Sequence, residues 1–264
     1  MEKSLLKYFE AKGIWKDRSL VWKGIDPDVN IIVGINGSGK STLLNVMYAA
    51  INGDVKALKS YGVNSNCFSF TPSREELAPI YLIRSFDTPI TDKRKTESQL
   101  LQQLNYVLYQ NREGFSFFNY RMRILDEPER AQEIQNHIKE LFSVVDEMFM
   151  ETGKKIEISH DSRSLLLFRK GDKVLHVEDL SSGEKQLLLL LVTVFLMDKQ
   201  KAILFMDEPE VSLHISWQQV LIDNLKRLNP NCQIVLATHS PSIISLGWGD
   251  KVVQTEDLLR VWEI

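Results

Sequence analysis

Cysteine is scarce in this sequence: its 264 residues include only Cys67 and Cys232, and there is no CxxC pair. We therefore expect neither a structural disulfide nor a cysteine-ligated zinc site. A charge excess of one sign is also missing, because 35 acidic residues nearly balance 32 lysines and arginines and leave a net charge of −3. Such a chain has no global basic field, so any binding to nucleic acid would need a local basic patch.

Long apolar runs are missing as well. Residues 1–10 lack the apolar stretch of about 7–15 residues that a signal peptide requires. The longest apolar run, Leu187–Met197, is well short of the roughly 20 residues that span a bilayer, and it predicts a buried helix instead. Apolar residues make up 44% of the chain and charged residues 25%, as in ordinary globular proteins. We expect a cytoplasmic protein.

Strand and helix patterns alternate at both ends of the chain. The apolar, β-branched segment 29–33 predicts a strand buried on both faces of a parallel sheet, and a helix follows at 41–51. The last third alternates again, with a helix at 182–197, a strand at 202–207, a helix at 212–228 and a strand at 233–238. Both ends are therefore expected to share one mostly parallel sheet, with the middle of the chain inserted.

The middle of the chain has a different pattern. A strand is expected at 79–83, and a polar helical stretch at 92–113 opens on the basic cluster Lys93-Arg94-Lys95. Apolar spacing predicts an amphipathic helix at 131–149. Three short alternating segments, 155–159, 164–169 and 173–177, then predict a small antiparallel meander. We divide the chain into an N-terminal core part (1–91), an inserted helical subdomain (92–153) and a C-terminal part with the meander, the helix at 182–197 and the rest of the core (154–264).

The segment Gly34–Ser41 matches the phosphate-binding pattern GxxxxGK[ST] between a buried strand and a helix. Its glycines let backbone N–H groups surround the phosphates, and the helix N-terminus adds positive potential. Lys40 would reach the β- and γ-phosphates, and Ser41 would ligate Mg²⁺. We therefore predict a P-loop (RecA-like) α/β fold that binds Mg-ATP. The predicted nucleotide-binding residues of this segment are Asn36, Gly37, Ser38, Gly39, Lys40, Ser41 and Thr42.

The tetrapeptide Asp-Glu-Pro-Glu occurs twice, at 126–129 and at 207–210. The first copy follows a segment that contains Arg121 and Arg123, which exclude a buried strand. We interpret it as a helix start, with Asp126 as the N-cap, Pro128 in the first turn and Glu129 favourable at the helix dipole.

The second copy follows the continuous apolar strand 202–206. A carboxylate at the end of such a strand emerges beside the P-loop, at the carboxyl edge of the sheet. Asp207 would hold Mg²⁺, and Glu208 would orient or deprotonate the attacking water. His239 follows the strand at 233–238 and reaches the same edge, where the γ-phosphate must lie. The predicted catalytic residues are thus Lys40, Glu208 and His239, and the predicted metal ligands are Ser41 and Asp207.

Leu-Ser-Ser-Gly-Glu at 180–184 precedes the apolar helix at 182–197. Ser181 and Glu184 form the pattern of a capping box. An exposed Ser-Ser-Gly at a helix N-terminus is also a phosphate site. Because the chain already has a P-loop, the nucleotide of a second subunit is the favoured ligand.

The order of these motifs resembles the ABC ATPase superfamily. The resemblance covers about 29–53 and 178–241 and is weak between them. It implies that Ser181 and Gly183 contact ATP held by the other protomer of a homodimer. It also implies that 212–214 is the D-loop and that His239 is the switch histidine.

Several features point away from transporter ATPases. Roughly 140 residues separate Lys40 from Ser181. No convincing Q-loop glutamine is present, and Gln99, Gln102 and Gln103 are candidates by position only. Glu184 stands where the signature motif usually has glutamine. The segments 207–214 and 237–244 resemble the OLD-like and RecF-like ATPases of bacterial defence and DNA-repair systems.

Two further features qualify this resemblance. The sequence ends about 25 residues after His239, so no TOPRIM nuclease domain like that of OLD proteins is expected. A long heptad arm of the SMC kind is also missing. An aromatic residue that stacks on adenine is expected before the P-loop, with Trp15 as the candidate and Trp22 as the alternative.

The leading functional hypothesis is a dimeric ATP switch that controls a separate effector, a nuclease or toxin, in bacterial anti-phage defence or DNA maintenance. One alternative is the nucleotide-binding subunit of an ABC transporter, which would require a Q-loop. The other is a stand-alone RecF-like DNA-repair clamp, for which the cluster at 93–95 with Arg121 and Arg123 offers a modest basic stripe. The sequence names neither the effector nor the trigger.

Overall fold

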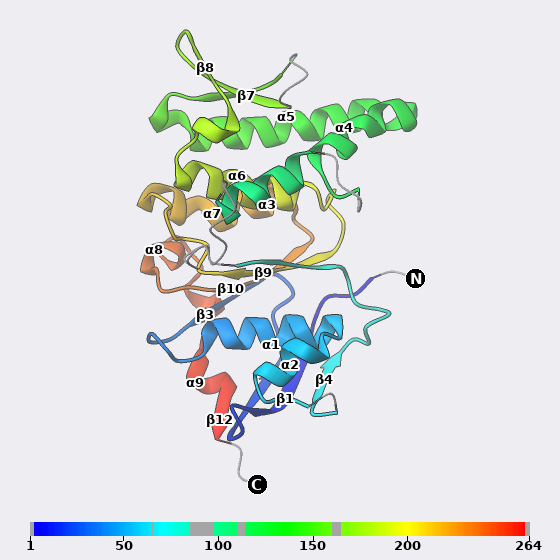
Figure 1. The fold of residues 1–264 in the computed structure, drawn as a ribbon, viewed down its shortest axis with the longest axis vertical. Helices are drawn as coiled ribbons and strands as arrows, with labels where there is room; N and C mark the ends of the chain where they lie inside the picture. The colour runs from blue at the N-terminus through cyan, green and yellow to red at the C-terminus, as the bar shows by residue number, and fades with distance from the viewer. Residues whose placement is uncertain (1–2, 65, 85–97, 110–113, 160–164, 262–264) are drawn as a thin grey trace. The chain divides into compact units, whose positions relative to one another are not determined.

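The computed structural model describes residues 3–64, 66–84, 98–109, 114–159 and 165–261. The chain forms two compact units (Figure 1). The first comprises 1–85, 200–210 and 231–264, and the second comprises 86–199 and 211–230. The helices α6 and α7, at 182–195 and 215–228, fall in the second unit. The three-part division expected from the sequence stays a prediction.

The first unit contains two sheets. A five-stranded sheet has the order β11-β3-β10-β9-β5, and a four-stranded sheet has the order β12-β2-β1-β4. The strands are β1 Tyr8–Ile14, β2 Arg18–Lys23, β3 Val29–Val33, β4 Phe68–Thr71, β5 Ile80–Ile83, β9 Ala202–Asp207, β10 Cys232–Ala237, β11 Val252–Gln254 and β12 Leu259–Val261. The helices are α1 Lys40–Asn52, α2 Val55–Ser60, α8 Pro241–Ile244 and α9 Thr255–Leu258, with a 3₁₀ turn at Gly249–Lys251.

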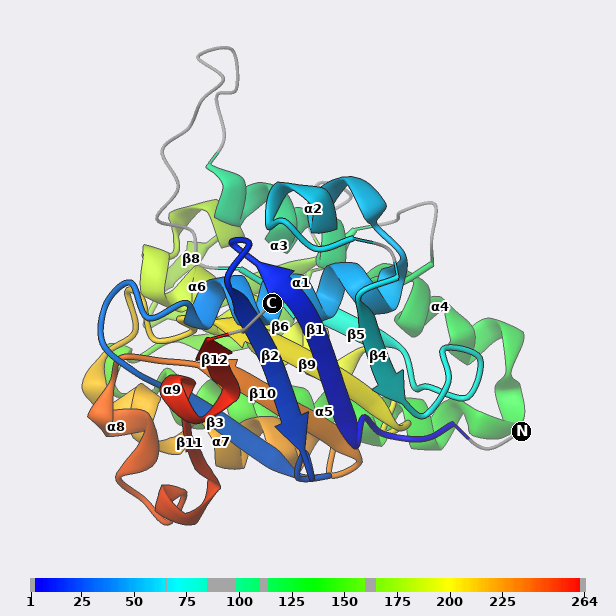
Figure 2. The same cartoon turned by 90° about the horizontal axis from the view of Figure 1, so that it is seen from below.

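The register of the five-stranded sheet brings three strand ends together. All its pairings are parallel, and Ala237 of β10 pairs with both Ile32 of β3 and Asp207 of β9. The segments that follow β3, β9 and β10 therefore leave the sheet at one edge, as the sequence predicted. The helix α1 lies between the two sheets (Figures 1 and 2), and its apolar residues 43, 44, 46 and 47 are fully buried. This packing holds the start of α1 beside the sheet edge.

The second unit is mostly helical. Its helices are α3 Gln99–Leu108, α4 Phe117–Asp126, α5 Ala131–Met148, α6 Ser182–Phe195 and α7 Ile215–Leu228, with 3₁₀ turns at Pro128–Arg130, Met150–Thr152 and Val177–Asp179. The apolar helix α6 packs against α3, α5 and α7. An antiparallel sheet of β6 Lys155–Ile158, β7 Leu166–Lys170 and β8 Lys173–Leu175 confirms the predicted meander. Among the described helices, none is both long and apolar enough to cross a membrane.

One local prediction was wrong: Asp126 is not an N-cap. It is the last residue of α4, a helix that begins after the N-cap Ser116 and that the sequence did not predict. The Arg123 side chain reaches Glu127 at i+4, with Nε 2.7 Å from Oε1, so the arginine that excluded a strand stabilises a helix end. Pro128 does begin a 3₁₀ turn, which leads into α5.

Candidate functional site

The segment between β3 and α1 forms a tight loop around the Lys40 side chain. Lys40 is only 4% exposed, and its Nζ donates hydrogen bonds to the carbonyl oxygens of Gly34, at 3.1 Å, and Ile35, at 3.2 Å. Burial lowers the pKa of Lys40, although the nearby Glu208 and Asp207 carboxylates oppose this. The ammonium group is thus held at the loop, and its bonded partners among the described residues are neutral carbonyl oxygens, an arrangement suited to an anionic ligand.

Two glycines give this loop its shape. Gly37 and Gly39 have φ angles of 79° and 102°, a region that favours glycine. Gly39 is also the N-cap of α1, and a Cβ atom there would collide with the Trp15 ring and with Leu259. The loop therefore has the backbone conformation that the predicted phosphate site requires, and it ends at the first N–H groups of α1.

Ser41 and Asp207 meet at the sheet edge although 166 positions separate them. The Ser41 hydroxyl donates to Asp207 Oδ1 at 2.9 Å. Burial raises the pKa of Asp207; the Ser41 hydrogen bond opposes the rise, and the Glu208 charge adds to it. A divalent cation would relieve this clustering of negative charge, and hydroxyl and carboxylate oxygens are ligands that Mg²⁺ accepts.

Glu208 and His239 form the third part of the site. Glu208 Oε1 lies 3.6 Å from His239 Nε2, and both side chains are partly exposed. They line a cavity of about 380 Å³ together with the loop. The other residues that line it are Trp15, Asn36, Gly37, Gly39, Lys40, Ser41 and Thr42. One cavity thus contains every catalytic residue that the sequence predicted.

The two aromatic candidates have different environments. Trp22 is 3% exposed in the core and is not accessible for stacking, whereas Trp15 is 45% exposed and lines the cavity. Trp15 and Lys16 both have positive φ angles, 51° and 80°, in the turn between β1 and β2. A bulky aromatic residue seldom adopts this conformation, and such strain is concentrated at functional sites.

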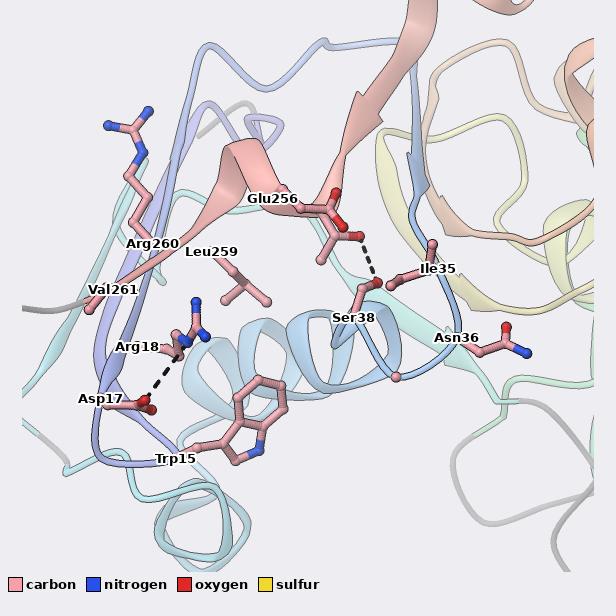
Figure 3. Close-up of a pocket in the computed structure, with 12 residues that line it drawn as sticks. Trp15, Asp17, Arg18, Ile35, Asn36, Ser38, Glu256, Leu259, Arg260 and Val261 are labelled. Carbon is pink, nitrogen blue, oxygen red and sulfur yellow. Dashed lines mark hydrogen bonds and ion pairs between the residues drawn. The ribbon is translucent and has the colours of Figure 1, made fainter.

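A second cavity, of about 720 Å³, shares Trp15, Asn36 and Gly37 of its lining with the first (Figure 3). One wall is formed by Thr255, Glu256, Leu259 and Arg260 near the end of the chain, residues that sequence reasoning missed. The Trp15 ring and the Leu259 side chain point into it (Figure 3). Thr255 is anchored because its hydroxyl donates to the Val33 carbonyl at 2.8 Å. This segment carries no recognisable motif in the sequence. It reaches the site because β11 pairs with β3 and β12 pairs with β2.

The Leu-Ser-Ser-Gly-Glu segment lies in the second unit. The capping box is confirmed: Ser181 Oγ accepts from the Glu184 N–H at 3.3 Å, and Glu184 Oε2 accepts from the Ser181 N–H at 2.8 Å. Glu184 is 1% exposed, and its Oε1 lies 2.5 Å from Lys154 Nζ. Burial acts to raise the pKa of Glu184, but the hydrogen bonds from Lys154 and Ser181 lower it overall. Glu184, which stands where the signature motif usually has glutamine, is therefore neutralised by the half-buried Lys154.

Gly183 has a packing role within its own unit. A side chain at this position would collide with the carbonyl oxygen of Ser212, whose φ of 67° is also in the left-handed region. The start of α6 and the segment 212–214 are therefore packed closely enough to require glycine. The predicted contact of Gly183 with a nucleotide stays a prediction.

Two of the remaining groups of candidates lie on helices of the second unit. Gln99, Gln102 and Gln103 lie at the start of α3, whose N-cap is Ser98. The cluster at 93–95 lies outside the described residues. Arg123 is engaged in ion pairs with Glu127 and Asp198. Half of the arginine pair proposed for a basic stripe is therefore neutralised within the chain.

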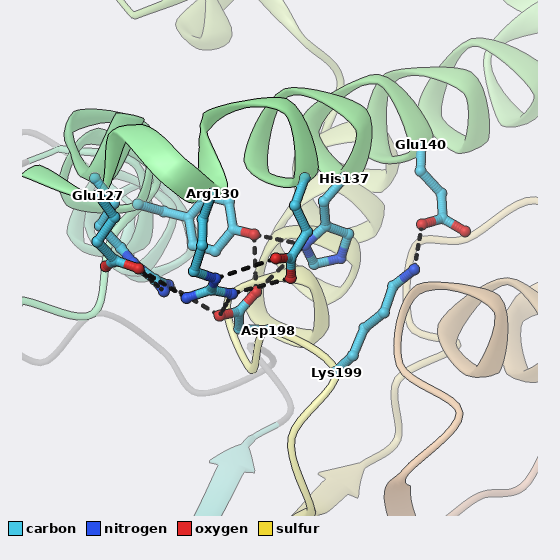
Figure 4. A network of polar contacts seen from close by, with 9 residues as sticks. Glu127, Arg130, His137, Glu140, Asp198 and Lys199 are labelled. Carbon is cyan, nitrogen blue, oxygen red and sulfur yellow. Dashed lines mark hydrogen bonds and ion pairs between the residues drawn. The ribbon is translucent and has the colours of Figure 1, made fainter. Parts of the chain in front are cut away.

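Asp198 is the centre of a polar cluster in the second unit (Figure 4). Its Oδ1 accepts a hydrogen bond from the Tyr120 hydroxyl at 2.8 Å, and its Oδ2 lies 2.9 Å from Arg123 Nη1 and 3.5 Å from Arg130 Nη2. Burial acts to raise the pKa of Asp198, but the neighbouring donors, among them His137 and Arg123, hold it well below its usual range. The cluster ties α4 and the start of α5 to the end of α6.

Asp198→Asn should destabilise the protein by about 3 kcal/mol at neutral pH, because it removes the charge that two arginines share. The backbone should tolerate the change, since asparagine accepts the positive φ of 51° at this position. An aspartate whose pKa is lowered in the folded state stabilises above its unfolded pKa of about 3.9 and loses this effect as pH falls toward the folded value. Urea unfolding of both proteins should therefore give a constant difference above about pH 5 and a shrinking one below it. A difference independent of pH down to acid unfolding would contradict the assignment.

Together the fold and the site define a P-loop ATPase of the ABC type. The chain belongs to the family described as "AAA domain, putative AbiEii toxin, Type IV TA system", which matches residues 68–245. The P-loop precedes the matched region, so the family assignment and the loop geometry are separate observations.

Two curated relatives come from bacteria. The chain is 28% identical over 159 residues to "Retron Vc95 probable ATPase" of Vibrio cholerae serotype O1 biovar El Tor. This alignment covers 56% of this chain and 27% of the relative. The chain is 33% identical over 89 residues to "Retron Ec83 probable ATPase" of Escherichia coli. That alignment covers 30% of this chain and 16% of the relative. The chain thus matches only about a quarter, or less, of the length of these relatives.

Solved structures show the same fold. An SMC head bound to the C-winged helix domain of ScpA matches with a TM-score of 0.60 at 14% identity, over 92% of each chain. Stu0660 of Streptococcus thermophilus matches with a TM-score of 0.53 at 12% identity, over 97% of this chain and 76% of that one. At such low identity these likenesses show the fold alone.

Proposed function

We propose that this chain binds Mg-ATP, hydrolyses it between two copies of itself, and thereby switches a separate effector. The observation that carries the ATPase part is the 2.9 Å hydrogen bond between Ser41 and Asp207 beside the buried Lys40. It brings together the three side chains that a P-loop enzyme needs to hold a phosphate and its metal ion.

The residues present fit the triphosphate of ATP. Lys40 is a buried cation whose bonded partners, within the described part of the chain, are two neutral carbonyl oxygens, and residues 36–37 and 39–42 line the same cavity. Lys40 would bind the β- and γ-phosphates, and the first N–H groups of α1 would donate to phosphate oxygens. Trp15, exposed at the cavity and held in a strained turn, is the side chain proposed to stack on adenine.

The residues present also fit Mg²⁺. Among the described residues, no group of three or more histidine, cysteine, aspartate or glutamate side chains could hold a metal by itself. Magnesium sites in such enzymes use one or two protein oxygens together with water and phosphate, and Ser41 and Asp207 supply those two. When bound, the ion would neutralise the charge that develops on the phosphates.

Glu208 is proposed to orient the attacking water and to accept its proton. Its carboxylate is partly exposed and lies at the cavity that also contains Lys40. His239 is proposed to donate a hydrogen bond to the γ-phosphate. The attacking water and the γ-phosphate would then meet between Glu208 and His239. This division of roles uses a carboxylate as the base and a neighbouring imidazole as a donor.

Ser181 and Gly183 are proposed to complete the site of a second copy. The Ser181 side chain caps α6, and Ser181 and Ser182 are both exposed at this helix N-terminus, where donors can face a ligand. A second copy's Ser181 would bind the γ-phosphate, so that ATP bridges two subunits. ATP binding would then assemble the dimer, and hydrolysis would release it.

A separate effector is proposed from the relatives. The family's description refers to a toxin and a toxin–antitoxin system, and two relatives are named as retron ATPases. We place this chain in bacterial anti-phage defence or DNA maintenance, with a nuclease or toxin as the partner. Co-purification of tagged chain with the product of the neighbouring gene tests this, and recovery of the chain alone, with and without ATP, would contradict it.

A mixing experiment tests the composite site. Lys40→Ala and Ser181→Arg should each be inactive alone. In a mixed dimer both lesions fall on one composite site, and the other site keeps wild-type Lys40 and Ser181. Mixing should therefore restore ATPase activity, up to one working site per heterodimer.

ATP-dependent dimerisation is measured beside the activity, because two sites that must fire together would leave the mixture inactive. Light scattering of the Glu208→Gln protein with ATP should show a dimer. A wild-type chain that stays monomeric with saturating ATP and still hydrolyses at full rate would refute the composite site.

A further inference from the structure

The second glutamate of the Asp207–Glu210 tetrapeptide has contacts that its position in the sequence does not suggest. Glu210 Oε1 accepts a hydrogen bond from the Thr238 hydroxyl at 2.6 Å and another from the His239 backbone N–H at 2.9 Å. The Thr238 oxygen in turn accepts from the Ser240 N–H at 2.9 Å. One carboxylate oxygen therefore holds, directly or through Thr238, the three residues that follow β10.

The backbone on the other side of this contact is also constrained. Glu208 has a φ of 49°, a left-handed conformation that is costly for a residue with a Cβ atom. Its N–H donates to the Ala237 carbonyl at 2.9 Å, and Pro209 follows. Strained residues persist only when the surroundings over-determine them. Two sets of hydrogen bonds supply that constraint. Glu208 itself is bonded to Ala237, and Glu210, two residues later, is bonded to Thr238 and His239.

We infer that Glu210 is a positioning residue that sets the separation of Glu208 and His239. The inference rests on the proposed function, in which this pair acts on water and the γ-phosphate. The two side chains come from different strands, and their 3.6 Å approach depends on how the two loops meet. The Glu210 side chain bonds one loop to the other, so its loss would free His239 and relax the Glu208 conformation.

Glu210→Ala should lower kcat by about a hundredfold, the cost of a displacement of roughly 1 Å at a reacting centre. The KM for ATP should stay at the wild-type value, because the P-loop is untouched. Glu210→Gln should keep most of the wild-type kcat, since an amide oxygen also accepts from Thr238 and His239. Thr238→Val removes one of the two donors and should lower kcat to an intermediate value.

The repeated tetrapeptide supplies a matched control. Glu129 occupies the same position in the other Asp-Glu-Pro-Glu and is exposed, so Glu129→Ala should hydrolyse ATP like the wild type. Thermal unfolding of every variant separates lost positioning from lost folding. If Glu210→Ala does not fold, Glu210→Gln and Thr238→Val carry the test.

Three results would overturn the inference: wild-type kcat in Glu210→Ala, equal losses in Glu210→Ala and Glu210→Gln, or a wild-type rate in Thr238→Val. Equal losses would mean that charge, and not hydrogen-bond acceptance, is what matters. A failure of the proposed function has a different signature. The wild type would then not hydrolyse ATP, or Lys40→Ala would match it, whatever Glu210 does.

Discussion

Glu208→Gln should retain ATP binding and slow ATP turnover by about two to four orders of magnitude, the usual contribution of a general base. The amide keeps the size of the side chain but cannot accept the proton of the attacking water. Ser41 and Asp207 remain bonded at 2.9 Å, so the proposed metal ligands are intact. Single-turnover kinetics with Mg-ATP measure the rate, and light scattering should find an ATP-bound dimer that persists.

The first Asp-Glu-Pro-Glu provides the control. Glu127 is bonded to Arg123 and Arg130 at the end of α4, so its role in the structure is to stabilise a helix end. Glu127→Gln should hydrolyse ATP at nearly the wild-type rate with a slightly lower thermal midpoint. A slow Glu127→Gln beside a normal Glu208→Gln would show that the wrong copy was assigned to catalysis.

Lys40→Ala should weaken Mg-ATP binding by about 3 kcal/mol or more, roughly a hundredfold or more in Kd. The change removes the buried ammonium group of Lys40, which would otherwise bind the phosphates. The protein should remain folded, because the bonds of Lys40 to described residues are those to two loop carbonyl groups, and burial already disfavours its charge. Isothermal titration calorimetry measures the affinity, and thermal unfolding checks the fold.

Lys56→Ala is the matched control. Lys56 is exposed on α2, and its loss removes the same charge without touching the loop. Its Kd for Mg-ATP should equal that of the wild type. A folded Lys40→Ala protein with unchanged affinity would remove the basis for assigning a nucleotide to this loop.

Motifs whose chemistry depends on the backbone were readable in the sequence. The P-loop needs a buried strand, glycines with positive φ and a helix start, and these demands leave a local pattern of residues. We chose Asp207 over Asp126 because an apolar strand precedes Asp207. In the structure, the parallel register brings Asp207 to Ser41. The capping box at Ser181 and Glu184 is equally local, because it involves one turn of one helix.

Contacts between distant side chains left no such pattern. The sequence offered Trp15 as the candidate for adenine stacking and Trp22 as the alternative, and packing placed Trp22 in the core and Trp15 at the cavity. The segment 255–261 reaches the loop only because β11 pairs with β3 and β12 pairs with β2.

The helix α4 was missed, and Asp126 misassigned, because Arg123 is neutralised by Asp198, which is distant in the sequence. The bonds of Glu210 to Thr238 and His239 also required two strand ends to meet. The sequence by itself therefore determined the class of protein and the residues that its backbone chemistry demands. Only the tertiary structure decided which other side chains share the site, since packing and hydrogen bonds between distant segments depend on the whole fold.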